Sequence, residues 1–106
     1  MENVTIGHNV KIGNGNIFWP CSHVAHDTTV GNFNFFTISV AVAGHVSVSD
    51  NCVFGANCTV KNGVKIGKNT LVGAAAYIRK DTEENSVYVP PKSYRLEGRS
   101  SLDFKL

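Results

Sequence analysis

Large apolar residues recur at every sixth position through most of the chain, from Ile6 to Ile78, without a miss. The thirteen members of this series are Ile6, Ile12, Phe18, Val24, Val30, Phe36, Val42, Val48, Phe54, Val60, Ile66, Val72 and Ile78. A spacing of six matches neither an α-helix, with about 3.6 residues per turn, nor a plain strand, with a period of two. It is the hexapeptide mark of a parallel β-helix, so the pattern predicts an all-β fold.

The other positions of each hexad support this prediction. The third residue after each large apolar residue is often Asn or Gly, as in Asn9 and Gly63, which tolerate positive φ and therefore predict a corner. The second residue before it is mostly small or β-branched, as in Val40 and Cys58, and is expected to point inward. Each hexad then forms one short strand and one corner. Three hexads close a coil, so thirteen predict about four coils in a single-stranded helix.

The repeat defines the domain organisation. Residues 1–89 are expected to form the β-helix, with Val87–Val89 as a last strand. Pro90 and the proline after it end strand pairing, because proline has no N–H to donate. Residues 90–106 are expected to form a short C-terminal tail with a candidate short helix over Tyr94–Leu102.

Composition and charge exclude several classes of protein. The 106 residues fit one domain. No apolar run is long enough to span a bilayer, and the start does not resemble a signal peptide, so neither a membrane association nor export is expected. The three cysteines have no metal-like spacing, which favours a reduced, cytoplasmic setting. The net charge is +2, with basic residues concentrated after residue 60. This asymmetry fits either solvated turns or a phosphorylated ligand, and nucleic acid is not expected.

Several apolar residues fall at positions that the register places outside the core. They are Ile17, Trp19, Phe33, Phe35, Ile38 and Ala41. An exposed apolar band of this kind usually marks an interface, and a prism with three faces suits a homotrimer with clefts between its subunits. The alternative is that Phe33 and Phe35 lie under the C-terminal tail.

Four segments carry a resemblance to a known family. They are His26–Gly31 (HDTTVG), Ala43–Val46 (AGHV), Val72–Ala76 (VGAAA) and Lys80–Val89 (KDTEENSVYV). Over roughly residues 4–95 the chain resembles the hexapeptide-repeat acyltransferases that acetylate sugars, namely sialic acid O-acetyltransferases and the N-acetyltransferases of 4-amino-sugar nucleotides. The resemblance implies a left-handed β-helix, a homotrimer and acetyl-CoA as donor. The acceptor would be a hydroxyl or amine of a sugar or sugar nucleotide.

The resemblance also implies roles for individual residues. His26 would be the general base, and Asp27 the acid that raises its basicity. Gly44 would offer its backbone N–H to the thioester carbonyl. The remaining residues implied to contact the donor are Phe35, Ala56 and Ala74. Among the basic residues of the C-terminal part, Lys80 is a candidate for the phosphates of the coenzyme.

Two departures from the family keep other functions open. Phe35 stands where many members have a second histidine, and the chain begins almost directly with hexads where those enzymes usually have an N-terminal sugar-binding domain. A non-catalytic trimeric module, or an inactive relative lacking that domain, is therefore the alternative. A zinc enzyme resembling the γ-class carbonic anhydrases is disfavoured because no two histidines lie five residues apart, and no metal is expected.

Overall fold

The computed structural model describes residues 3–104, which form fourteen two-residue strands and one short 3-10 helix. The strands assemble into three parallel sheets, named here A, B and C. Sheet A contains β1 (Thr5–Ile6), β4 (His23–Val24), β7 (Ala41–Val42), β10 (Thr59–Val60) and β13 (Tyr77–Ile78). Sheet B contains β2 (Lys11–Ile12), β5 (Thr29–Val30), β8 (Ser47–Val48) and β11 (Lys65–Ile66). Sheet C contains β3 (Ile17–Phe18), β6 (Phe35–Phe36), β9 (Val53–Phe54), β12 (Leu71–Val72) and β14 (Val87–Tyr88).

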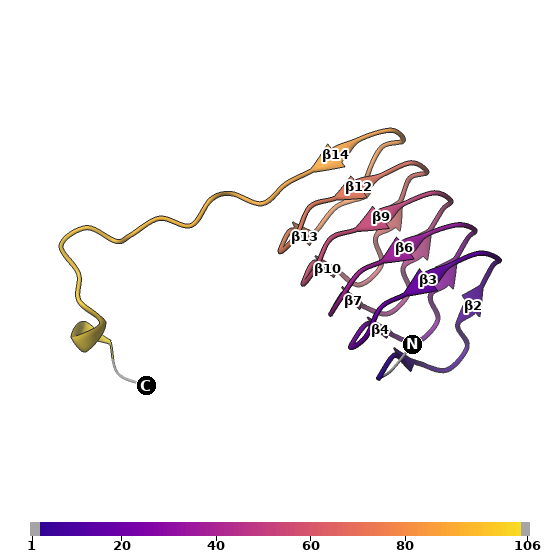
Figure 1. The fold of residues 1–106 in the computed structure, drawn as a ribbon, viewed down its shortest axis with the longest axis horizontal. Helices are drawn as coiled ribbons and strands as arrows, with labels where there is room; N and C mark the ends of the chain where they lie inside the picture. The colour runs from indigo at the N-terminus through magenta and orange to yellow at the C-terminus, as the bar shows by residue number, and fades with distance from the viewer. Residues whose placement is uncertain (1–2, 105–106) are drawn as a thin grey trace.

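The chain visits sheets A, B and C in turn, and each turn forms one coil of a prism (Figure 1). Strands of successive coils pair in parallel, and residues 18 positions apart lie side by side, such as His23 and Ala41. This arrangement confirms the all-β parallel β-helix predicted from the hexads. The sheets hold five, four and five strands, so the stack approaches five coils where the repeat alone predicted about four. The difference comes from β14, which lies beyond the last hexad.

The hexad residues point into the prism and form its core. Phe18, Phe36 and Phe54 stack face to face on sheet C, with ring centroids 4.6 Å apart at both contacts. Eleven of the thirteen hexad residues are buried, but Ile6 and Ile12 are 41% and 39% exposed. The apolar series therefore lines a buried core everywhere except at these two positions. They lie in the first coil, and nothing within residues 3–104 packs beneath it.

The predicted corners are present throughout the stack. Positive φ occurs at the third residue after each hexad residue from Ile6 to Val72, including Asn9 (55°) and Gly63 (81°). It also occurs at residues that rarely adopt it, such as Phe33 (59°) and Ala75 (64°). The backbone geometry of the stack therefore determines the corner conformation even where the residue type does not favour it.

The last coil departs from the hexad pattern. No strand of the described chain follows β11 in sheet B. Instead the Lys65 N–H donates to the Asp81 carboxylate, and the Gly67 N–H donates to the Thr82 hydroxyl. The chain then returns to sheet C as β14, as the sequence predicted for this segment. Side chains of the loop thus replace a further strand at the top of sheet B.

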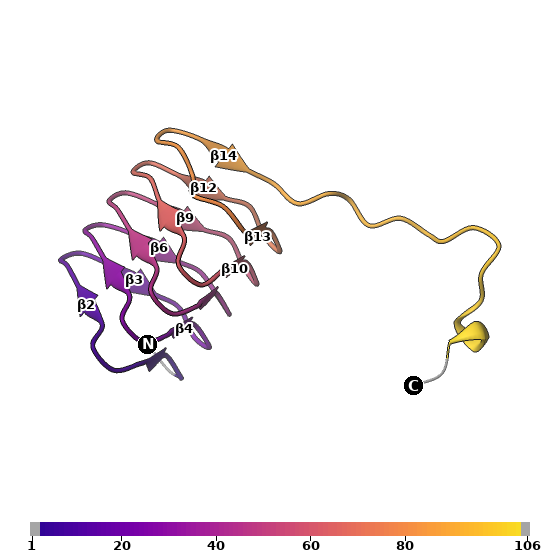
Figure 2. The same ribbon diagram turned by 180° about the vertical axis from the view of Figure 1, so that it is seen from behind.

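The C-terminal tail leaves the prism at β14 and runs away from it (Figures 1 and 2). The short helix expected over Tyr94–Leu102 is replaced by extended chain followed by a single 3-10 turn, η1 (Ser101–Asp103). Ser100 caps this turn by accepting from the Leu102 N–H, which explains its position. The tail runs away from β6, the strand that contains Phe35 (Figure 2), and the Phe33 side chain is 64% exposed. Among the residues described, no helix is long and apolar enough to cross a membrane.

Candidate functional site

The candidate site lies on the edge where the chain turns from sheet A to sheet B. Two residue pairs, His26-Asp27 and Gly44-His45, occupy equivalent corners of successive coils on this edge. The backbone N–H of His45 donates to the His26 carbonyl at 3.0 Å, and the Asp27 N–H donates to the His8 carbonyl at 3.1 Å. The corners are therefore fixed to one another through the main chain, and their side chains project from a rigid column.

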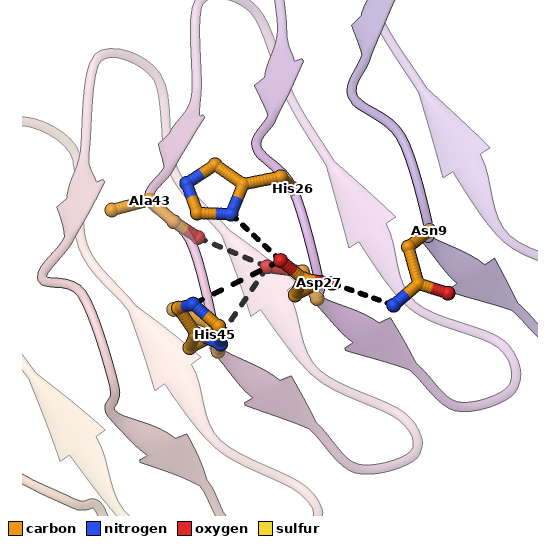
Figure 3. A network of polar contacts seen from close by, with 7 residues as sticks. Asn9, His26, Asp27, Ala43 and His45 are labelled. Atoms are coloured by element: carbon orange, nitrogen blue, oxygen red, sulfur yellow. Dashed lines mark hydrogen bonds and ion pairs between the residues drawn. The ribbon is translucent and has the colours of Figure 1, made fainter.

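Asp27 is the centre of the polar contacts on this edge (Figure 3). Its Oδ2 lies 2.9 Å from Nδ1 of His26 and 3.8 Å from Nε2 of His45. Its Oδ1 accepts a hydrogen bond from the side-chain amide of Asn9, 2.5 Å away. The hydrogen bond from Asn9, followed by the one from His26, lowers the pKa of the Asp27 carboxyl below its ordinary value. Asp27 is therefore held as a carboxylate that faces two imidazoles.

The His26 ring is bounded on three sides. The His8 ring stacks against it with centroids 5.9 Å apart, and the His45 ring meets it edge to face at 5.1 Å. On the remaining side lies Gly44, where an added Cβ would come within 2.7 Å of Cε1 and Nε2 of the ring. A side chain at position 44 would therefore displace the imidazole, so glycine at this position sets the place of the His26 ring.

The other predicted site residues are distributed over the prism. Lys80 follows β13 by two residues, as His26 follows β4, so it lies on the same edge three coils further along. Ala56 and Ala74 follow strands of sheet C and lie on the edge between sheets C and A. Phe35 lies within sheet C and contacts Trp19 at a centroid distance of 5.0 Å. One chain therefore brings His26, Asp27, Gly44 and Lys80 onto one edge but leaves the other three elsewhere.

Two residues of the site were not assigned to it from the sequence, namely Asn9 and His45. The signal that could have found them is the coil length. Asn9, Asp27 and His45 are separated by 18 residues each, which places them at one corner of three successive coils. The 18-residue coil period therefore identifies side chains that are neighbours in space although they are far apart in the sequence.

A depression of about 240 Å³ lies at the far end of the same edge. Its lining includes Tyr77, Arg79, Lys80 and Tyr88. It combines two cationic side chains and two aromatic rings with the carboxylate of Asp81, so its net charge is positive, which suits a phosphorylated or heterocyclic group.

The outer face of sheet C is apolar along the stack. Its outward residues form one column from coil to coil, and their exposed fractions range from intermediate to 64%. The column consists of Ile17, Phe35, Val53, Leu71 and Val87. The column runs along the whole length of the prism. Of the apolar residues predicted to lie outside the core, Ile17 and Phe35 belong to it, whereas Trp19, Phe33, Ile38 and Ala41 lie outside sheet C.

A family model and solved structures support the class of fold. The model described as "Hexapeptide repeat of succinyl-transferase" matches residues 45–80. A search of curated proteins gave no significant match. The structure has the parallel β-helix that the six-residue pattern predicted, and the predicted similarity of the chain to hexapeptide-repeat acyltransferases is confirmed.

Three solved structures illustrate this similarity. Serine acetyltransferase isoform 3 from Entamoeba histolytica has a TM-score of 0.80 and 20% identity, over 95% of this chain and 40% of that chain. LpxA from Acinetobacter baumannii has a TM-score of 0.75 and 29% identity, over 83% of this chain and 42% of that one. A GDP-perosamine N-acetyltransferase from Caulobacter crescentus has a TM-score of 0.53 and 21% identity, over 83% and 50%. The chain thus spans half or less of each of these proteins.

Proposed function

We propose that the protein is an acetyl-CoA-dependent acyltransferase in which His26 is the general base. The acceptor would be a hydroxyl or amine of a sugar or sugar nucleotide. The observation that carries this proposal is the 2.9 Å contact between Nδ1 of His26 and the Asp27 carboxylate, on a corner exposed to solvent. The names of two similar structures, a serine acetyltransferase and a perosamine N-acetyltransferase, support the reaction class.

The contact to Asp27 determines which ring nitrogen can accept a proton. A carboxylate only accepts hydrogen bonds, so Nδ1 carries the hydrogen and Nε2 of the neutral ring keeps its lone pair. Nε2 can then remove the proton of the acceptor as its oxygen or nitrogen attacks the thioester carbonyl. Asp27 stabilises the imidazolium that forms, because its negative charge lies beside the ring. Such general base catalysis contributes typically about 10²–10⁴-fold in rate.

The thioester needs a hydrogen-bond donor for the oxyanion that develops as the acceptor attacks. We assign this role to the backbone N–H of Gly44, for which no main-chain acceptor is found within residues 3–104. When the intermediate collapses, the carbon–sulfur bond breaks and coenzyme A leaves as its thiol. A fixed backbone donor of this kind is worth a few kcal/mol in the transition state.

The course of the donor follows from the position of Lys80. It lies three coils from His26 on the same edge, which corresponds to roughly 14 Å at the strand spacing of a sheet. An extended pantetheine arm can bridge this distance and place the phosphates of the coenzyme at the depression lined by Arg79 and Lys80. The positive charge of the C-terminal part would then serve the coenzyme.

A homotrimer would unite the remaining donor residues with this edge. Ala56 and Ala74 lie on another edge of the same chain, so they can approach the His26 edge only from a neighbouring subunit. The apolar column on sheet C offers a surface for that contact, since exposed apolar bands of this kind mark interfaces. We therefore propose sites between subunits, with Phe35 at the contact.

The test measures coenzyme binding and turnover separately. Coenzyme A binding is measured by calorimetry, and acetyl transfer from acetyl-CoA to amino-sugar and sugar-nucleotide acceptors is followed for wild type and His26→Ala. We expect binding by both proteins and a loss of about 10²–10⁴-fold in kcat for the variant. His23→Ala is the matched control, because His23 lies on β4 only three residues away but outside the Asp27 contacts. Absence of binding at millimolar coenzyme, or binding without turnover, would support a non-catalytic module instead. Equal turnover by wild type and His26→Ala would rule out His26 as the general base.

A further inference from the structure

The corner that holds His26 also brings together a set of metal-ligating atoms. One atom each from His26, Asp27 and His45 lies within 4.8 Å of the others. Oδ2 of Asp27 is central, at 2.9 Å from Nδ1 of His26 and 3.8 Å from Nε2 of His45. Two imidazole nitrogens and one carboxylate oxygen are ligands that zinc takes in open sites, with water in the fourth position.

The two distances to Oδ2 of Asp27 are compatible with a tetrahedral ion, and the ligand nitrogens of His26 and His45 lie within 4.8 Å of each other. With metal–ligand bonds of about 2.0–2.2 Å, neighbouring ligand atoms of a tetrahedral zinc site lie roughly 3.4 Å apart. The two observed contacts, 2.9 and 3.8 Å, lie on either side of that value, and shifts of about half an ångström in the side chains would equalise them. The side chains of His26 and His45 are 47% and 60% exposed, so an ion can enter directly from solvent.

The chain also holds these ligands in place. The backbone hydrogen bond from the His45 N–H to the His26 carbonyl fixes the two corners at 3.0 Å. The Asn9 amide binds Oδ1 of Asp27, which orients the carboxylate and leaves Oδ2 for the two histidines. Outer hydrogen bonds of this kind orient the ligands in metal sites.

We propose that His26, Asp27 and His45 form a binding site for a divalent transition metal such as zinc, and that its occupancy switches off the proposed transferase. The inhibitory consequence rests on the proposed function of His26. Coordination through Nδ1 uses the lone pair of that nitrogen, so the hydrogen of the neutral ring moves to Nε2. Nε2 then has no lone pair for the acceptor proton, and the metal also occupies the carboxylate. Metal binding and base catalysis therefore exclude each other at this corner.

Zinc binding is tested without coenzyme or acceptor. Zinc sulfate is titrated calorimetrically into untagged protein, into His45→Asn and into Asp27→Asn. Asparagine suits both positions because it tolerates their φ values of 56° and 58°. We expect one zinc per wild-type chain and an affinity reduced at least about tenfold in each variant. His23→Gln is the matched control and keeps the wild-type affinity, since His23 lies outside the cluster.

The results separate this proposal from the proposed function. No binding at about 1 mM zinc, or equal binding by wild type and both asparagine variants, overturns the metal site whatever the transferase assay shows. If transfer is observed, we expect zinc to inhibit wild type in step with its measured affinity, and the zinc concentration for half inhibition of His45→Asn to rise at least about tenfold. Zinc that binds at this site but leaves transfer unchanged overturns the switch.

Discussion

Gly44→Ala is the substitution that most directly tests whether the His26 geometry matters for function. Gly44 lies against the imidazole, and its φ is not in the positive range, so alanine suits the backbone. The new methyl group would meet Cε1 and Nε2 of His26 at 2.7 Å. Because the atoms it meets belong to the end of an exposed side chain, the ring moves rather than the main chain.

The size of that movement follows from the contact distance. The ring must retreat by about 0.7 Å to reach the 3.4 Å at which ordinary van der Waals contact begins. Nε2 is the nitrogen proposed to accept the proton, so the shift acts on the reacting atom itself. A misplacement of about 1 Å can cost about 10²-fold in rate. We therefore expect kcat/KM for acetyl transfer to fall by up to about 10²-fold, while stability changes by less than about 1 kcal/mol.

Gly55→Ala provides the opposite outcome as a control. Its added Cβ would meet the backbone nitrogen of Ala74 at 2.5 Å and the Gly73 carbonyl carbon at 2.8 Å. Main-chain atoms of a stacked coil cannot rotate away, so this substitution should lower the unfolding midpoint clearly. Denaturation curves and steady-state kinetics on both variants separate the two effects.

The reasoning would be refuted if Gly44→Ala kept wild-type kcat/KM and also kept the wild-type imidazole signals of His26 in NMR spectra. It would also be refuted if Gly44→Ala lost as much stability as Gly55→Ala. In that case the methyl group would be displacing the coil and not the ring.

Two further predictions concern the core. Phe36→Ala removes the central, fully buried ring of the aromatic stack and should lower the free energy of unfolding, measured by urea denaturation, by about 3–5 kcal/mol. A loss below about 1 kcal/mol would contradict a stabilising role of the stack. In native protein a thiol reagent at pH 8 should label Cys21 alone, because Cys21 is exposed whereas Cys52 and Cys58 are buried, and burial raises the pKa of the Cys58 thiol to about 11. Rapid labelling of all three cysteines before denaturation would argue against this packing.

The fold could be predicted from the sequence because one repeated constraint acts on every hexad. The inward residue, the small residue two positions before it and the corner three positions after it recur together, and all three have the predicted locations in the structure. The prediction failed at the two ends of the described chain, where neighbouring coils or hexads are absent. Ile6 and Ile12 keep the pattern but have no described coil beneath them, and the tail forms only the turn at Ser101–Asp103.

The site was less predictable because it depends on contacts between coils. His26 and Asp27 are consecutive in the sequence, so this pair could be predicted as a base and its acidic partner. Asn9 and His45 are each 18 residues from Asp27, and the corner motif alone does not show which side chains of neighbouring coils meet. The spacing argument against a metal site considered only histidines five residues apart, and it therefore missed a cluster in which His26 and His45 are 19 residues apart.

The corner column also explains why residue types alone could not reveal the chemistry. Asn9, Asp27 and His45 all have φ between 55° and 58°, and Asn, Asp and His are the residues, apart from glycine, that tolerate this conformation best. A β-helix therefore places hydrogen-bonding and ligating side chains at its corners for conformational reasons. This corner differs from the others because Asn9 and His45, from the coils on either side, both approach the carboxylate of Asp27. In addition, Gly44 leaves space for the His26 ring, which also contacts that carboxylate. Function at this edge thus depends on the alignment of columns, and an insertion of one residue between Asp27 and His45 would disrupt it while leaving every hexad on either side intact.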